Sequence, residues 1–389
     1  MVDTAEILQR ITRLQEQLSP LQLDGALLVH PIDIYYFSGT RQNGVLWVPA
    51  TGAARLLVRK SLSRARAEAT AVTVQPFPAS KEFAALFSEA VTRIGMTFDV
   101  LPVQQQQFYA KLLPGREFVD ISMVNRSLRS VKSAWELERL RRAGEQLCSV
   151  FAAVPHFLRA GMSELELAAE FEYRLRRAGG EGYVRMRAFN QELALGLALS
   201  GDSATQPGFF DGAVTGPGLS SASPQGASRA AIGRDTPVFI DYTGVFDGYI
   251  VDMTRVYVCG TLDAELRRAF AVALDIQAWV AARLKPGAIC EELFLGAAQL
   301  AEAAGFGAHF MGAPGENARF VGHGVGLELD ELPVLAQGFK QPLAAGQTIA
   351  VEPKFVFPGR GVVGIENTFA VSAEGGVKLT DSPDDLVVL

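Results

Sequence analysis

Four carboxylates lie in the middle of apolar segments, where an unpaired charge is costly to bury. Asp241 lies in VFIDYTG and Asp252 in YIVDMTR, while Glu352 lies in IAVEPKF and Glu366 in VGIENTF. The apolar residues of these segments follow the pattern of strands. Each acid therefore needs a partner, which could be a cation, a shared proton or an arginine.

The spacing within each pair predicts that its two acids meet. Asp241 and Asp252 are eleven positions apart, so a hairpin turning at Phe246–Asp247 would set them directly opposite one another. Glu352 and Glu366 are fourteen positions apart, which suits a turn centred on PGRG. Directly opposed like charges destabilise a sheet. We therefore expect two facing pairs of carboxylates with a cation between them.

His323, in VGHGVGLELDELP, is one of four histidines in the chain. It could be a metal ligand, an acid–base group or a packed core residue. Gly322 and Gly324 beside it would let the backbone approach a metal closely. One imidazole among four carboxylates is a donor set typical of Mn, Co, Fe or Zn, and four negative charges balance two divalent ions. We therefore predict a two-metal site with a water of lowered pKa as nucleophile.

These segments resemble the pita-bread metallopeptidase family, which includes prolidases, Xaa-Pro aminopeptidases and methionine aminopeptidases. The matching pieces are FIDYTGVFDGYIVDMTR, GHGVGLEL, VEPK and GIENTFAVSAEGG. The N-terminal half is similar to the creatinase-type domain of prolidases, notably in IYYFSGT, and LRSVKSAWELERLRRAGE resembles the usual join between the two domains. The resemblance covers nearly the whole chain in the family's order.

The resemblance implies a role for each residue of the site. It implies five metal ligands, namely Asp241, Asp252, His323, Glu352 and Glu366. It also implies two divalent metal ions, a bridging hydroxide as nucleophile, and Glu352 as a ligand that also relays a proton. The implied substrate is a small peptide or amide, most simply an Xaa-Pro dipeptide, and the implied assembly is a homodimer.

The chain departs from the prolidase pattern beside the histidine. The family has a histidine four residues earlier, where this chain has Arg319, and another seven residues later, where it has Asp330. Loss of one such donor typically lowers the rate about a hundredfold to a thousandfold. Arg319 could instead bind a carboxylate, and Asp330 with Glu331 could bind an amine; alternatively, Arg319 and Asp330 pair with each other or face solvent. Both count as candidate catalytic residues, beside Glu352 and His323.

Other positions are weaker candidates. His309 could supply an imidazole to the site, although a loop or core position is its more ordinary role. Four polar residues in VRMRAFNQE could line a pocket, namely Arg185, Arg187, Asn190 and Gln191. Two further departures from the family pattern are Gly364, in place of an arginine, and Val356, in place of a tyrosine.

Three functions fit these observations. The first is a two-metal hydrolase of the Xaa-Pro dipeptidase or aminopeptidase type. The second keeps the metal but hydrolyses a non-peptide C–N bond or acts as a lyase, which the missing histidines favour. The third is a non-catalytic binding protein, against which five retained ligands argue.

The elements that must position these residues form two parts. Residues 1–128 alternate short strands with helices, including a helix predicted over 80–95, and fit a small α/β domain of creatinase type. Residues 129–389 fit a pita-bread domain of α+β class, because helix pairs and hairpins replace strict βαβ alternation. This part opens with a long helix for which Ser133 and Glu136 predict a capping box.

Composition excludes several classes of function. Of 389 residues, 49% are hydrophobic and 20% charged, which is ordinary for a globular protein, and the net charge of −6 gives no reason to expect nucleic acid as a partner. No apolar run reaches membrane-spanning length, and residues 1–18 fit an amphipathic helix rather than a signal peptide. Three widely spaced cysteines favour a reducing cytoplasm.

Overall fold

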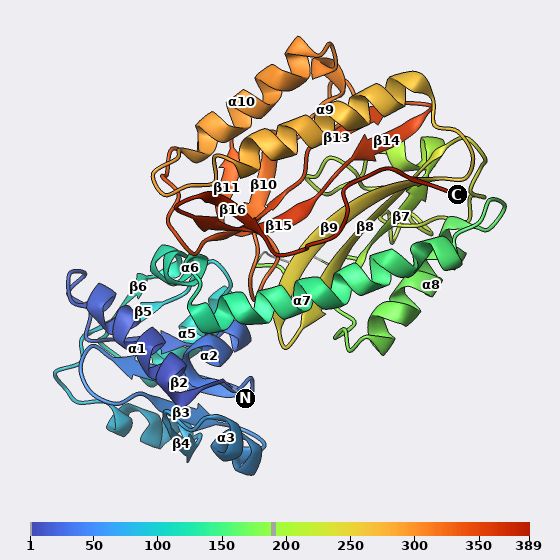
Figure 1. The fold of residues 1–389 in the computed structure, drawn as a ribbon. Coiled ribbons are helices and arrows are strands. Elements are labelled where there is room, and N and C mark those ends of the chain that lie inside the picture. The colour runs from blue at the N-terminus through green and yellow to red at the C-terminus, as the bar shows by residue number, and fades with distance from the viewer. Residues whose placement is uncertain (1, 188–191) are drawn as a thin grey trace. The chain divides into compact units, whose positions relative to one another are not determined.

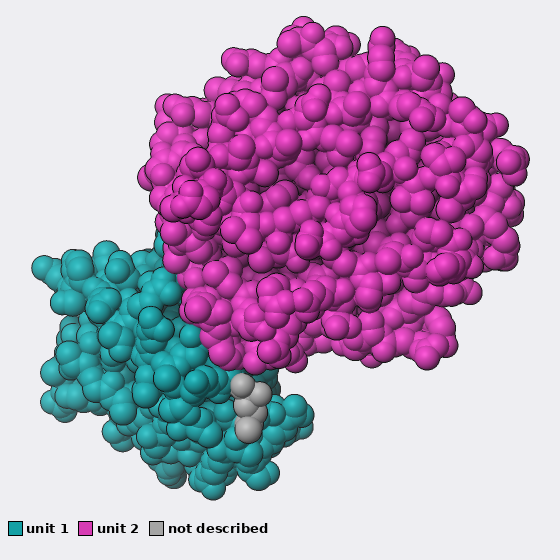
Figure 2. All heavy atoms as spheres, in the orientation of Figure 1, with its two compact units in different colours: residues 1–129, 187–189 teal, residues 130–186, 190–389 magenta. Residues whose placement is uncertain are grey.

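The computed structural model describes residues 2–187 and 192–389, so the candidates Asn190 and Gln191 lie outside the described residues. The described chain separates into two compact units (Figure 2). Unit 1 holds residues 2–129 and 187, and unit 2 holds residues 130–186 and 192–389. The division lies next to the predicted boundary after residue 128, and the assignment of the two parts as domains stays a prediction.

Unit 1 is built on one six-stranded mixed sheet in the order β4-β3-β2-β1-β5-β6. Its core gathers aliphatic and aromatic side chains from the sheet and from α5, such as Leu27, Trp47, Ile94 and Tyr109. The elements are α1 Thr4–Leu18, β1 Gly25–Leu28, α2 Pro31–Ser38, β2 Gly44–Pro49, β3 Arg55–Val58, α3 Leu62–Glu68, β4 Thr73–Pro76, α4 Ser80–Phe83, η1 Ala84–Leu86, β5 Arg93–Met96, α5 Val103–Leu112, β6 Glu117–Asp120 and α6 Ser122–Ser130.

The helix predicted over 80–95 is wrong in its second half. Helical structure ends at Leu86, and the chain enters β5 at Arg93. β5 pairs in parallel with both β1 and β6, and the Asp24 carboxylate accepts hydrogen bonds from the backbone N–H groups of Thr92 and Arg93. Tertiary pairing therefore overrides the helical pattern of this segment.

Unit 2 contains three sheets, in the strand orders β11-β10-β12-β15-β16, β13-β14 and β17-β9-β8-β7. The elements are α7 Ala134–Ala153, η2 Val154–His156, α8 Glu164–Arg177, β7 Gly196–Ser200, η3 Gly201–Thr205, β8 Pro237–Phe246, β9 Tyr249–Val258, α9 Ala264–Ala281, α10 Cys290–Ala303, η4 Gly307–His309, β10 Phe320–Gly324, β11 Glu331–Ala336, β12 Thr348–Val351, β13 Lys354–Phe357, β14 Gly361–Gly364, β15 Asn367–Ser372, β16 Gly375–Lys378 and β17 Val387–Val388.

Helices cover these sheets from two sides (Figure 1). α7 packs on β8 and β9 and α8 packs on β7, while α9 contacts β13 and β14 and α10 contacts β11. The predicted start of α7 is confirmed, because the Ser133 side chain accepts from the Glu136 N–H and the Glu136 side chain accepts from the Ser133 N–H. The predicted α+β class is confirmed as well.

The N-terminal segment forms the expected amphipathic helix. Asp3 caps α1 by accepting a hydrogen bond from the Ala5 N–H, and Ile7, Ile11 and Leu14 are buried. Among the residues that the structure describes, no helix is both long and apolar enough to cross a membrane.

Candidate metal centre

The β8–β9 hairpin carries the two aspartates on one face. Asp247 and Gly248 form its tight turn with φ angles of 49° and 84°, as a type I′ turn requires. This turn lies one residue later than predicted, so Asp241 pairs with Thr254 and not with Asp252. The expectation of directly opposed aspartates is therefore wrong. Because Asp252 lies two residues from Thr254, the aspartates are diagonal neighbours on the same face.

The two glutamates lie opposite one another, as predicted. On one side of them Val351 pairs with Asn367, and on the other side Lys354 pairs with Gly364. Both ladders have the same register, so Glu352 and Glu366 stand face to face between them. Each glutamate also lies between two strands of different sheets. At Glu352 the chain passes from the five-stranded sheet into the β13–β14 pair, and at Glu366 it passes back.

His323 lies on β10, buried among the carboxylates. Its Nε2 atom is 3.5 Å from Glu352 Oε1 and 4.0 Å from Glu366 Oε1. Its Nδ1 atom is 3.2 Å from Asp330 Oδ1. Burial alone would lower the pKa of His323, but the charges of Asp330, Glu352 and Glu366 outweigh burial and raise it.

The glycines that flank His323 allow the adjacent strands to approach β10 closely. A Cβ at Gly322 would lie 2.5 Å from the Ala350 carbonyl oxygen, and one at Gly324 would lie 2.5 Å from the Glu331 carbonyl oxygen. The two glycines therefore leave space for the backbones of the adjacent strands, β11 and β12, whereas the sequence suggested that they make room for a metal.

Asp330 and the Gly324 carbonyl oxygen both lie 3.2 Å from Nδ1 of the predicted ligand His323. A carboxylate on one ring nitrogen fixes the ring and leaves the other nitrogen for a metal, and loss of such a partner typically lowers metal affinity or activity about 10- to 100-fold. We therefore expect Asp330→Asn to weaken Mn²⁺ binding about 10- to 100-fold in a competition titration with a chelator. Arg319→Ala is the matched control and should bind Mn²⁺ as the wild type does. Wild-type affinity in Asp330→Asn would show that Asp330 does not act through His323.

Three of the predicted ligands form a group that could hold a metal ion. One ligand atom each from Asp252, His323 and Glu366 lie within 4.8 Å of one another, and all three residues are buried. Burial raises the pKa of Asp252 well above its usual value, and the charges of Glu366 and Asp241 raise it further. One nitrogen and two carboxylates suit a single Mn, Co, Fe or Zn ion.

Lys354 lies in the same cluster, and the sequence analysis did not single it out. Its Nζ atom donates to three carboxylate oxygens, which are Asp241 Oδ2 at 2.8 Å, Glu352 Oε2 at 2.7 Å and Glu366 Oε2 at 3.0 Å. Burial alone would lower the pKa of Lys354, but these three charges hold it well above its usual value. Asp252, His323 and Glu366 therefore fit one divalent ion. The carboxylate oxygens that a second ion would need already bind the Lys354 ammonium group.

A sequence signal for Lys354 was available. The lysine follows Glu352 by two positions in the apolar stretch IAVEPKFVF, and residues two apart on a strand face the same side. A lone lysine in a buried strand needs acidic partners, and the predicted ligands were the nearest acids.

The other candidates around the histidine separate into different roles. Glu331 accepts from the buried Lys132 ammonium at 2.9 Å and from the backbone N–H groups of Leu327 and Glu328, so it is not free to bind a substrate amine. Arg319 is exposed, and no ion pair joins it to Asp330 in the part of the chain that the structure describes. Its proposed contact with a substrate carboxylate stays a prediction.

The weaker candidates form hydrogen bonds and ion pairs that stabilise local structure. His309 Nδ1 lies 2.7 Å from the Val356 carbonyl oxygen, and its ring stacks on Phe357. Arg185 donates to the carbonyl oxygens of Leu327 and Gly248. Arg187 belongs to unit 1, where it pairs with two aspartates. None of these three contacts a predicted metal ligand through the bonds described here.

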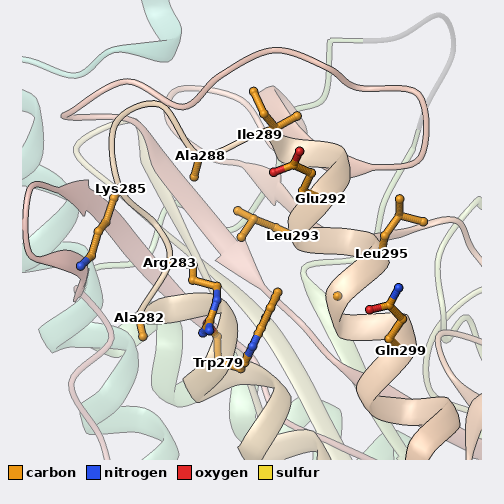
Figure 3. Close-up of a pocket in the computed structure, with 11 residues that line it drawn as sticks. Trp279, Ala282, Arg283, Lys285, Ala288, Ile289, Glu292, Leu293, Leu295 and Gln299 are labelled. Atoms are coloured by element: carbon orange, nitrogen blue, oxygen red, sulfur yellow. The ribbon is translucent and has the colours of Figure 1, made fainter.

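A groove elsewhere in unit 2 is separate from this cluster. It encloses about 870 Å³ between the end of α9 and α10, and Figure 3 shows Trp279, Arg283, Leu293 and Gln299 around it. The Arg283 guanidinium lies 4.1 Å from the centre of the Trp279 ring. No predicted metal ligand lines the groove, so it is not the substrate pocket of the candidate centre.

Comparison with known proteins accounts for this arrangement. Residues 138–373 match the model of metallopeptidase family M24, and these residues span more than half of the chain. The chain belongs to metallopeptidase family M24. Residues 10–131 of this M24 protein match the creatinase/prolidase N-terminal domain. The pita-bread fold and the creatinase-type N-terminal domain predicted from the sequence are thereby confirmed.

Relatives of this M24 protein match it over almost its whole length. The Xaa-Pro dipeptidase of Pyrococcus furiosus is 26% identical over 381 residues, which cover 97% of this chain and 99% of that protein. Among solved structures, an Xaa-Pro dipeptidase from Bacillus anthracis superposes with a TM-score of 0.85 at 24% identity, over 98% of this chain and 100% of that one. The prolidase from Pyrococcus horikoshii gives a TM-score of 0.81, also at 24% identity, over 97% and 100%.

Proposed function

We propose that this chain is a metal-dependent hydrolase of small peptides, with Xaa-Pro dipeptides as the substrate class. The main support is that His323 and four carboxylates gather in one buried cluster of unit 2. The Pyrococcus furiosus relative is an Xaa-Pro dipeptidase, and this similarity supports the same substrate class. A homodimer, a cytoplasmic location and the choice among Mn, Co, Fe and Zn remain predictions.

In this proposal the side chains of the cluster bind the metal, position the histidine and carry a proton. Asp252, His323 and Glu366 would hold a divalent ion, which when bound would polarise the scissile carbonyl group and lower the pKa of water. Asp330 contacts Nδ1 of His323 and so turns Nε2 toward the cluster. Glu352 holds and releases a proton at Oε1, while its Oε2 stays hydrogen-bonded to Lys354.

A panel of peptides tests the substrate class. Enzyme reconstituted with Mn²⁺ or Co²⁺ should release proline from Xaa-Pro dipeptides, and EDTA should abolish the release. Dipeptides with alanine in the second position serve as the matched control. Metal-loaded enzyme that hydrolyses no member of an Xaa-Pro panel would exclude the peptidase form of this proposal.

A second reaction on the same centre is supported by one observation. The two positions where prolidases carry further histidines hold an exposed arginine, Arg319, and an aspartate, Asp330, that contacts the ligand histidine. His309 faces Phe357 and does not replace them. A non-peptide C–N hydrolase or a lyase would fit this loss, and mass spectrometry of the products from mixed amide substrates would distinguish it from a peptidase.

A further inference from the structure

We propose that the Lys354 ammonium takes the place of one of the two metal ions that the sequence pattern predicts, so that the centre holds one divalent ion. This inference rests on the metal-dependent hydrolase proposed above, because it concerns the cations of that same site. It changes the expected number of ions and leaves the family and the substrate class as they are.

The position of the ammonium group is the first support. All three N–H donors of Lys354 are used by oxygens at 2.7 to 3.0 Å, one from each of three predicted ligands. A metal ion bound to these oxygens would lie about 2.0–2.2 Å from them. It would therefore occupy the same space as Nζ and repel its charge.

The backbone fixes Lys354 in this position. Lys354 lies on β13 opposite Gly364, and a Cβ at Gly364 would come within 2.8 Å of the Lys354 Cα and Cγ atoms. The lysine carbonyl oxygen accepts from the Met311 N–H at 2.9 Å. The side chain is only 4% exposed. The glycine therefore provides the space in which the lysine stem runs toward the carboxylates.

The two oxygens of Glu366 divide the centre into two cation sites. Oε2 accepts from Lys354 and from Thr254 Oγ1, while Oε1 faces His323 Nε2. Asp252 does not contact the ammonium and belongs to the group around the histidine. Asp252 and Glu366 carry the two negative charges that one divalent ion balances. On the other side, the ammonium of Lys354 binds Asp241 and Glu352 and balances one of their two negative charges.

The number of bound ions tests the proposal. Full-length protein is reconstituted with excess Mn²⁺, freed of unbound metal and analysed by elemental mass spectrometry against protein concentration. We expect one Mn²⁺ per chain in the wild type and two in Lys354→Met, which removes the ammonium but keeps an apolar stem. Lys132→Met, which removes a buried lysine bound to Glu331, is the matched control and should bind one.

Two aspartate variants locate the single ion. Asp252→Asn should lose it, with an affinity loss exceeding the about 10- to 100-fold expected for an outer partner. Asp241→Asn should keep one ion. Two ions in the wild type, or loss of the ion in Asp241→Asn, would overturn the proposal even if Lys354→Met fails to fold. Hydrolysis of Xaa-Pro peptides is read separately, so an inactive protein with one ion would refute the proposed function and leave this inference standing.

Discussion

Glu352→Gln should lower the turnover of an Xaa-Pro dipeptide by about 10²- to 10⁴-fold, the usual contribution of one general acid–base group. Glu352 Oε1 is the oxygen that faces His323, and Oε2 is held by Lys354, so only one oxygen is placed to carry a proton. Glutamine keeps the size of the side chain but cannot exchange that proton. The measurement is kcat and KM with Mn²⁺-loaded protein, together with its metal content.

The control for this variant is another glutamate in unit 2. Glu291 lies on α10, where its side chain accepts a hydrogen bond from the Gly338 N–H, and Glu291→Gln should keep full turnover. A Glu352→Gln protein that keeps its metal and loses less than about tenfold in kcat would show that Glu352 is not the proton carrier.

Asp33→Asn should destabilise unit 1 by about 3–5 kcal/mol, because it removes the charge of a buried carboxylate that pairs with two buried arginines. Asp33 is fully buried, and its Oδ1 atom lies 2.9 Å from Arg187 and 3.4 Å from Arg129, while Thr97 donates to Oδ2. Hydrogen–deuterium exchange of residues 24–38 should report the loss as faster exchange at neutral pH. Asp99→Asn, which removes the more exposed partner of Arg187, should cost less than about 1 kcal/mol.

Asp33 also makes the stability of unit 1 depend on pH. Burial alone would raise the pKa of Asp33, but the hydrogen bond to His30 and the charges of Arg187, His30 and Arg129 hold it well below its usual value. A lowered pKa in the folded state adds stability that is complete above the unfolded pKa of about 3.9 and is lost as the pH falls below it. The wild type and Asp33→Asn should therefore differ most near neutral pH and converge in acid. An equal difference at pH 7 and pH 3 would contradict this role.

The sequence predicts the centre where local pattern and spacing decide the geometry. Glu352 and Glu366 face each other as expected because paired strands on both sides hold one register. The aspartates are offset because the preference of Asp247–Gly248 for positive φ angles moved the turn by one residue. A shift of one position in a turn changes the cross-strand partner by two, and apolar patterning alone cannot detect it.

Features set by contacts distant in sequence were harder to predict. Residues 88–95 carry a helical pattern, yet β5 forms there because β1 and β6 offer pairing on both sides. Lys354 has one partner, Glu352, close in sequence, but its contacts with Asp241 and Glu366 form only where separate strand segments converge. The capping box at Ser133, by contrast, depends on four consecutive residues and was predicted correctly.

Glu366 has a consequence for how the centre responds to heat. Its backbone exchanges hydrogen bonds with Thr254 of the four-stranded sheet, β14 ends two residues before it, and β15 of the five-stranded sheet begins directly after it. Three sheets thus meet at one ligand, and unfolding any of them would displace its carboxylate. We therefore expect thermal inactivation to follow the cooperative unfolding of unit 2 as a whole.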